Sequence, residues 1–434
     1  MRQLPSHLAI IVGAAAVAAG VVSGWVAGVV VVLIGVGVLA STWFGARIAT
    51  DVDRGWLSVL LPLAFIAKMV GSAVRYFVVA ELYGIGDSFS YHAIGLRVAP
   101  VWRSLQVPEV TGGSFGTQVT GQITGLLYTI VSPPLIGGFM VFATLSFIGM
   151  VCFYVAFRRT MPQWGVLPYF VLLFFLPTML FWPSSVGKDA LSVLGLGLVT
   201  LGSVWLFSAR FTSGLWLAGA GGLLLGLVRP HILAIAVGSI VLAVVFTRAG
   251  RLDVSRAARV LLMVIALIAM AYVVPIAAAR IGIDEGLESF LADQQQHTAQ
   301  GGSAVLGEPA TSPLDLPEAT LRVLFRPLPY EAATPGMLFS ALEGVVLLGL
   351  LVWKTPTMWA NRRIVRRTPY MILSLAFTSA FVIAFSSVFN LGIIARQRSQ
   401  VIPFLLVVIV GLGWQRWSPS DRARAGTPRE EVTT

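Results

Sequence analysis

Residues 25–45 read WVAGVVVVLIGVGVLASTWFG and contain no charged residue. At a rise of about 1.5 Å per residue, an apolar segment of this length is long enough to cross a bilayer as a helix. The apolar residues are continuous rather than alternating, and Val, Leu, Ala and Gly dominate, which argues against the strands of a membrane barrel. The segment therefore predicts a transmembrane helix.

Similar segments recur along the whole chain and predict an all-α fold, a polytopic membrane helix bundle with about twelve spans. The pair 213–228 and 231–247 fits either two spans or one broken helix. The first segment also fits a signal peptide. The expected membrane domain covers residues 1–415, and residues 416–434 are expected to form a disordered cytoplasmic tail. The predicted spans are about 8–23, 25–45, 56–80, 133–157, 165–181, 190–208, 213–228, 231–247, 260–279, 337–354, 369–389 and 401–415.

Composition excludes several other classes of protein. Of the 434 residues, 57% are hydrophobic and 11% are charged, whereas a soluble domain carries roughly 25% charged residues. A soluble enzyme, a disordered chain and a coiled coil are therefore excluded. Cys152 is the only cysteine, so neither a disulfide within the chain nor a thiolate metal cluster can form. The basic residues behind the net charge of +11 flank apolar segments, which predicts membrane lipids and no nucleic acid as partners.

The distribution of Lys and Arg predicts the orientation. With the N-terminus in the cytoplasm, most basic residues fall in the inner loops, as the positive-inside rule requires. This predicts a multi-pass protein of the bacterial cytoplasmic membrane with both termini cytoplasmic. Two long loops, about 81–132 and 280–336, then lie outside, where we expect the chemistry. Lys68 and Arg75 are seven residues apart within one predicted span, so they should share a face turned to the protein interior, with Glu343 as a candidate partner.

Asp87 is the first candidate for chemistry, in the sequence Gly-Asp-Ser-Phe-Ser-Tyr-His at residues 86–92. A carboxylate at this position can act as a general base or hold a divalent metal, and Tyr91 and His92 follow about one helical turn later. The alternative interpretation is a helix N-cap, with Asp87 or Ser88 capping a helix that begins near Phe89.

A second candidate reads Trp-Pro-Ser-Ser-Val-Gly-Lys-Asp at residues 182–189. Ser184, Ser185 and the Gly187 backbone can bind an anion at the start of the next helix, where Lys188 adds a positive charge. The alternative is an ordinary helix start with Lys188 and Asp189 as a surface pair. The spacing does not match a phosphate-binding P-loop.

Three further motifs carry arginine on the predicted outer side: Arg229-Pro230-His231, Arg396-Gln397-Arg398, and residues 325–331 with Arg326, Tyr330 and Glu331. An arginine at the centre of a span costs about 2.5–3.5 kcal/mol, and two guanidinium groups can bind a diphosphate. The alternatives are an interfacial turn, a flanking charge cluster and a loop anchor before the next span.

Two motifs resemble the integral-membrane, polyprenyl-phosphate-dependent glycosyltransferases of the GT-C type. They are the Asp87…Tyr91 spacing in a long early loop and the Arg396-Gln397-Arg398…Pro403 run before the last span, which is similar to the Arg-Tyr-Arg…Pro ending of several such enzymes. Residues 182–189 and 229–231 resemble motifs of bacterial envelope-polysaccharide membrane proteins. The acidic loop follows the third predicted span here, whereas GT-C enzymes usually place it after the first.

The resemblance implies transfer of a sugar from a polyprenyl-phosphate carrier to a glycan, lipid or protein acceptor on the outer face of the membrane, in cell-envelope glycan synthesis. Asp87 would then be the general base and His231 would orient the reactants. A divalent metal, Mg or Mn, is a candidate cofactor, and no metal ligand is assigned. The expected substrate-binding residues are Tyr91, His92, Lys188, Asp189, Arg229, Arg326, Glu331, Arg396 and Arg398.

Two other functions stay open. A polysaccharide polymerase or ligase that uses diphosphate-linked oligosaccharides would need the same outer arginines. A polytopic transporter or flippase fits the number of spans, although no internal repeat is visible.

Overall fold

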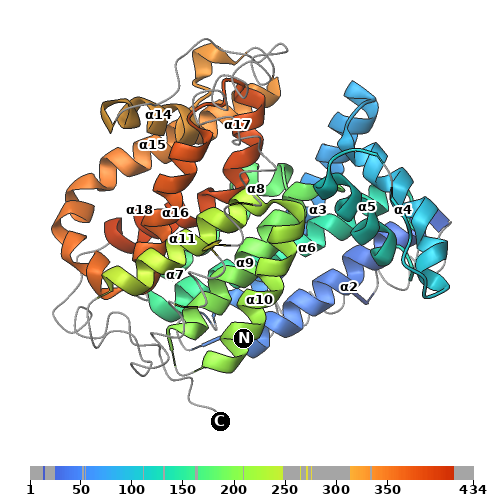
Figure 1. Ribbon diagram of the computed structural model, residues 1–434, viewed down its shortest axis with the longest axis horizontal. Coiled ribbons are helices and arrows are strands. Elements are labelled where there is room, and N and C mark those ends of the chain that lie inside the picture. Colours follow the sequence, from blue (N-terminus) through green and yellow to red (C-terminus); the bar gives the residue numbers. More distant parts are fainter. Residues whose placement is uncertain are drawn as a thin grey trace. The chain divides into compact units, whose positions relative to one another are not determined.

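The computed structural model describes residues 25–50, 55–110, 112–130, 132–161, 165–208, 210–247, 313–332 and 335–414, with isolated positions at 13–14, 53, 264, 270–271 and 275. Within these residues the regular elements are helices and no strand occurs (Figure 1). The predicted all-α class is therefore confirmed. The predicted segments 8–23 and 260–279 and the tail 416–434 lie outside the described residues, apart from a few of the isolated positions.

Six of the described helices are long and apolar enough to cross a membrane, and the number is seven if a bent pair counts as one span. The two halves of that pair, Leu391–Gln400 and Ile402–Gly413, meet at 62°. Three shorter apolar helices are Val166–Phe175, Pro230–Phe246 and Pro369–Phe385. The finer count of about twelve spans still rests on the sequence. The six helices are Gly28–Ile48, Leu57–Tyr83, Leu135–Thr160, Lys188–Leu206, Phe211–Val228 and Met337–Arg367.

The chain divides into two compact units. Unit 1 comprises Met1–Met150 with Met179–Leu194, and unit 2 comprises Val151–Thr178 with Gly195–Thr434. Helices α6 (Leu135–Thr160), α8 (Pro177–Phe181) and α9 (Lys188–Leu206) each continue from one unit into the other. Unit 1 also contains α2 (Trp25–Ile48), α3 (Leu57–Tyr76), the π-helix η1 (Phe77–Tyr83), α4 (Asp87–Arg103) and α5 (Phe115–Leu127).

Helices α4 and α5 of unit 1 occupy the predicted outer loop 81–132 and lie side by side (Figure 1). They approach closely because small residues face each other: a Cβ on Gly95 would lie 2.5 Å from Thr124, and one on Gly121 would lie 2.5 Å from Ile94. Arg103, at the end of α4, donates hydrogen bonds to the carbonyl oxygens of Tyr128 (3.0 Å) and Thr129 (2.8 Å) just after α5. The two helices are therefore parallel, with both N-termini at the same end of the pair.

Unit 2 is built around α18 (Ile402–Gly413), all of whose residues are buried. A helix that is apolar on every side belongs in a core. The ring of Phe377 stacks on that of Phe404 at 4.0 Å, and Cys152 is also buried in this unit. The other elements are α7 (Val166–Phe175), α10 (Phe211–Val228), α11 (Pro230–Phe246), η4 (Pro313–Asp315), α14 (Leu316–Phe325), η5 (Pro329–Glu331), α15 (Pro335–Asn361), η6 (Arg362–Arg367), α16 (Pro369–Phe385), α17 (Leu391–Gln397) and η7 (Arg398–Gln400).

The predicted span at 165–181 is wrong as a single helix. Helix α7 ends at Phe175, and Leu176 is extended, with φ −63° and ψ 133°. The cause is Pro177, because a proline disfavours the helical conformation in the residue that precedes it. The ten residues of α7 reach about 15 Å, which is too short to cross a bilayer alone.

The ambiguity at Arg229-Pro230-His231 resolves into two helices. Arg229, with φ −145° and ψ 76°, separates α10 from α11. Pro230 is the first residue of α11, where a proline is favoured because it needs no hydrogen-bond donor there.

Two glycines of α15 provide a test of the packing. A Cβ on Gly344 would lie 2.1 Å from the carbonyl oxygen of Phe325, whereas one on Gly349 would meet nothing within 4 Å. We expect Gly344→Ala to lower the free energy of unfolding by about 1–3 kcal/mol through overpacking. Gly349→Ala should be neutral or stabilising by up to about 1 kcal/mol. Thermal unfolding of the purified proteins in detergent measures both, and equal melting temperatures would contradict the packing of α14 on α15.

Candidate functional site

The predicted site residues fall into two groups, one in each unit. Unit 1 contains Asp87, Tyr91, His92, Lys188 and Asp189, and unit 2 contains Arg229, His231, Arg326, Glu331, Arg396 and Arg398.

In unit 1, helix α4 begins at Asp87, and Gly86 occupies the N-cap position. The prediction that Asp87 or Ser88 caps a helix starting near Phe89 is therefore wrong. Gly86 adopts a φ of 156°, which favours glycine over a residue with a side chain. Asp87 lies exposed in the first helical turn, where the helix dipole stabilises a carboxylate.

The turn between α8 and α9 meets this helix through Gly187. A Cβ on Gly187 would lie 3.4 Å from the ring of Tyr91, and Tyr91 is buried. Tyr91 follows Asp87 by one helical turn, and Lys188 follows Gly187 directly. The structure therefore brings together two of the predicted motifs, although they are far apart in the sequence.

Lys188 also reaches the start of α5. Its ammonium group donates hydrogen bonds to Thr117 Oγ1 (3.1 Å) and Ser114 Oγ (3.4 Å), and Ser114 is the N-cap residue of α5. Helices α5 and α9 thus both begin at this lysine. Tyr91, one turn into α4, lies against the adjacent Gly187. Helix N-termini and a lysine together favour an anion. We call Asp87, Tyr91, Ser114, Thr117 and Lys188 the N-terminal site.

Sequence reasoning missed Ser114 and Thr117. The signal in the sequence was the pair Gly112-Gly113 directly before Ser114, which is typical of a turn before a helix. In the structure both glycines have a positive φ (87° and 73°). A serine or threonine at such a start is a common cap, but nothing in the spacing pointed to Lys188.

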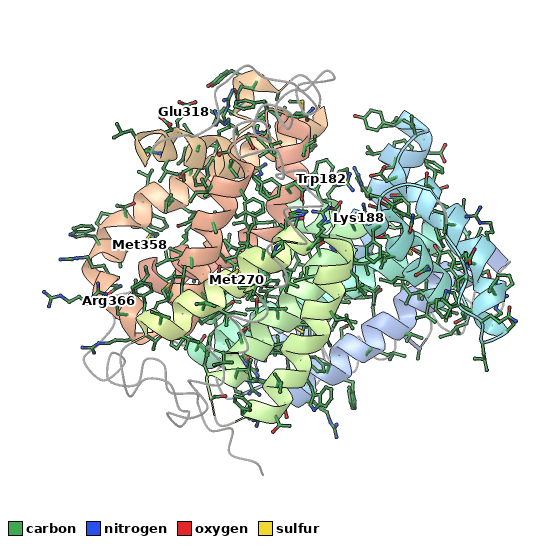
Figure 2. The ribbon with its side chains drawn as sticks, in the orientation of Figure 1. Trp182, Lys188, Met270, Glu318, Met358 and Arg366 are labelled. Carbon is green, nitrogen blue, oxygen red and sulfur yellow. The ribbon has the colours of Figure 1, made fainter. Side chains whose placement is uncertain are left out.

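The α8–α9 turn is held in place by polar side chains from α3 and α6. Ser72 Oγ donates to the carbonyl oxygen of Ser184 (3.1 Å), and Ser146 Oγ donates to that of Pro183 (2.6 Å). Figure 2 shows Trp182 and Lys188 near the two ends of this turn. Asp189 is buried, so the alternative of a Lys188–Asp189 surface pair is wrong.

Lys68 and Arg75 both contact the segment that precedes this turn, which confirms that they share one face of α3. The buried ammonium group of Lys68 donates to the carbonyl oxygen of Met179 (2.6 Å). The guanidinium of Arg75 lies 4.7 Å from the ring centres of both Phe181 and Trp182. The observed partner of Lys68 is thus a backbone carbonyl.

His92 forms part of the contact between α4 and α5. Its Nδ1 atom lies 2.9 Å from the hydroxyl oxygen of Tyr128, and the two rings meet edge to face. Burial lowers the pKa of His92 and raises that of Tyr128. Both groups therefore favour their neutral forms, which suits a structural contact.

In unit 2, Arg398 is fully buried and its guanidinium group is bound by protein acceptors. It donates to the carbonyl oxygen of Leu324 (3.1 Å) and to both the carbonyl (3.4 Å) and the hydroxyl oxygen of Ser340. Glu343, three residues after Ser340, attracts Arg398 and accepts a hydrogen bond from the Thr178 N–H (2.6 Å). These contacts fit a role in joining η7 to α14 and α15 better than the predicted contact with phosphate.

Arg229 is also buried, and it donates a hydrogen bond to the side-chain oxygen of Gln397. The same oxygen accepts a hydrogen bond from Gln400. Arg229 therefore contacts the residue that follows Arg396 in the sequence. The side chain of Arg396 is half-buried. The ring of His231 lies 6.4 Å from that of Phe385. Sequence reasoning missed Gln397 and Gln400 as partners, although two amides beside arginines in an apolar region are a usable signal.

Arg326 and Glu331 pair with each other. Arg326 Nε donates to both carboxylate oxygens of Glu331 (2.8 and 3.1 Å), and the Leu328 N–H donates to Oε2 (2.7 Å). Burial raises the pKa of Glu331, but these hydrogen bonds lower it more, so its pKa lies below the ordinary value. The pair thus neutralises two of the predicted substrate-binding residues.

Arg322, which sequence reasoning missed, precedes Arg326 by one turn of α14. It donates to the carbonyl oxygen of Ser386 (2.9 Å), and its guanidinium lies 4.7 Å from the ring centre of Phe389. We call these five arginines of unit 2, Arg229, Arg322, Arg326, Arg396 and Arg398, the arginine cluster.

Among the described residues, no group of three or more His, Cys, Asp or Glu side chains is arranged to hold a metal ion. Comparisons of the chain with protein-family models, curated proteins and solved structures found no match.

The lowered pKa of His92 predicts a dependence of stability on pH. A histidine that is kept neutral by burial stabilises the fold above its unfolded pKa of about 6.5. That contribution is lost as the pH falls below this value towards the lower folded pKa. We therefore compare melting temperatures from about pH 7, just above the unfolded pKa, down to about pH 5. Over this range the melting temperature of the wild type should fall more steeply than that of His92→Gln. Parallel curves for the two proteins would contradict the burial of His92.

The attraction between Arg398 and Glu343 predicts coupled stability. Removing the Arg398 guanidinium leaves the buried acceptors of Leu324 and Ser340 without their donor, at a cost of about 1–3 kcal/mol for each buried group. Arg398→Met should therefore strongly destabilise the fold. The double variant Arg398→Met/Glu343→Gln should be less destabilised than the sum of the two single variants. Thermal unfolding of the four proteins measures this coupling, and strict additivity would show that the charges do not interact.

Proposed function

We propose that this chain is a GT-C-like membrane glycosyltransferase with about twelve spans in a bacterial cytoplasmic membrane. It transfers a sugar from a polyprenyl-phosphate carrier to an acceptor on the outer face. The observation that carries the proposal is the contact of Tyr91 with Gly187, which joins the Asp87 helix to the Lys188 turn.

The N-terminal site supplies the groups that such a transfer needs. Asp87 is exposed, and its carboxylate takes the proton of an acceptor hydroxyl as the new glycosidic bond forms. The bond from the sugar to the phosphate oxygen breaks, and the phosphate leaves with the bonding electrons. Lys188 and the starts of α5 and α9 stabilise the negative charge of the departing phosphate.

The length of α15 supports the outer location of the arginine cluster. Arg398 contacts α15 at Ser340, and the basic element η6 follows Asn361. The stretch from Ser340 to Asn361 spans about 32 Å, close to the roughly 30 Å of a hydrocarbon core. The positive-inside rule assigns the four arginines of η6 to the cytoplasm, which leaves the arginine cluster at the outer face.

A polysaccharide polymerase or ligase is the second candidate. The hydrogen bond from Arg229 to Gln397 places Arg229 beside the residue next to Arg396, and the proposal is that these two arginines act as a pair. Such a pair suits the two phosphates of a diphosphate-linked oligosaccharide.

Asp87→Asn tests the proposed reaction in membrane vesicles supplied with radiolabelled polyprenyl-phosphate sugars. We expect the rate of transfer to endogenous acceptors to fall by about 10²–10⁴, because the amide cannot act as a base. The matched control is Glu81→Gln, which neutralises another exposed carboxylate and should keep the wild-type rate.

Other outcomes of this assay would reject the proposal. A full rate with Asp87→Asn would remove Asp87 from the mechanism. Long glycan chains formed only from diphosphate-linked donors would identify the polymerase or ligase. Movement of labelled donor across the membrane without bond formation would identify a transporter.

A further inference from the structure

The C-terminal end of α15 carries a basic element outside the N-terminal site and the arginine cluster. Residues 362–367 read Arg-Arg-Ile-Val-Arg-Arg and form the 3₁₀ helix η6. Arg362, Arg363 and Arg366 are exposed, whereas Ile364 between them is buried. Figure 2 shows Arg366 far from Glu318, which lies near the other end of α15.

This element is held in a fixed place. Ile364 packs into the core of unit 2, and the side-chain amide of Asn361 donates to the carbonyl oxygen of Leu412 (2.8 Å). Arg362 Nη1 donates to the carbonyl oxygen of Trp359 (2.8 Å), one of the last carbonyl groups of α15. The helix dipole also favours cations at this end of α15. The arginines are therefore presented by an ordered element.

Aromatic side chains lie along the last turns of the same helix. Trp353 and Trp359 are exposed, at 65% and 68%. The ammonium group of Lys354 lies 3.7 Å from the ring centre of Trp353 and 4.5 Å from that of Trp414, and the guanidinium of Arg362 lies 4.5 Å from that of Trp359. Tryptophan gathers at the level of lipid headgroups, where one side of the ring is wet and the other is apolar. This arrangement places the basic element at that level.

In the part of the chain that the structure describes, these charges have no carboxylate as an ion-pair partner. Residues 344–414 contain no Asp or Glu. Across the described ranges, no carboxylate forms an ion pair with Arg362, Arg363 or Arg366. Each basic residue near a membrane surface attracts anionic lipid with about 1 kcal/mol, so three exposed arginines favour phosphate-bearing headgroups.

We propose that η6, with Trp353, Lys354 and Trp359, is a binding site for the headgroup phosphates of anionic phospholipids. The exposed rings beside the cations distinguish a lipid from a free phosphate, because they offer apolar contact to the acyl-chain boundary. The proposal rests on the membrane location of α15 and not on the proposed sugar transfer.

The test titrates phosphatidylglycerol, phosphatidylcholine and inorganic phosphate separately onto the purified full-length chain in neutral detergent, with binding followed by native mass spectrometry and thermal shift. The variant Arg362→Gln/Arg363→Gln/Arg366→Gln should weaken phosphatidylglycerol binding on the order of a hundredfold. The control Arg97→Gln removes an exposed arginine of α4 and should leave that binding unchanged. The variant Arg362→Lys/Arg363→Lys/Arg366→Lys keeps the charge and should keep most of the affinity.

Several results would overturn the proposal. They are an unchanged affinity in the Gln variant, inorganic phosphate binding as tight as that of phosphatidylglycerol, or equal binding of phosphatidylcholine. A loss in the Lys variant as large as in the Gln variant would also overturn it. The melting temperature without lipid identifies a fold defect. The proposal predicts that this temperature is the same in the variants and the wild type, whereas a damaged fold would lower it. Loss of sugar transfer in the Asp87 assay would leave this result untouched.

Discussion

A charged side chain in an apolar interior must find partners, and this requirement orders the helices of unit 2 around Arg398. Its guanidinium group is fully buried, so it takes acceptors from the end of α14 and from the first turns of α15. A glycine at position 344 leaves the room for this close approach. Lys68 obeys the same requirement in unit 1, where its partner is the carbonyl oxygen of Met179. In both units the hydrogen bonds of a buried charged side chain fix the position of one helix along its neighbour, which apolar packing alone does not define.

The second organising feature is the separation of two basic groups along α15. The arginine cluster lies towards the N-terminal part of this helix, and η6 follows its C-terminus. The distance between them is close to the thickness of a hydrocarbon core. The two groups also differ in chemistry. Four members of the cluster, Arg229, Arg322, Arg326 and Arg398, are hydrogen-bonded to protein groups, whereas Arg363 and Arg366 are exposed.

The sequence was sufficient for the fold class and for the position of many helices, because continuous apolar length alone predicts them. It also contained the signal for the break at Leu176, since Pro177 follows directly. It could not reveal that Tyr91 meets Gly187, because this contact depends on how α4 packs against a distant turn. Arg396 and Arg398 looked equivalent in the sequence, and only the packing of η7 makes one half-buried and the other fully buried.

The burial of Cys152 has a practical consequence. It is the only cysteine of the whole chain, and its thiol lies in the core of unit 2. A thiol enclosed by protein atoms is out of reach of reagents in solution, and cysteines buried in this way are inert. Maleimide reagents should therefore leave the folded protein almost unmodified, and a cysteine introduced at any exposed position would become its single point of attachment for a spin label or fluorophore.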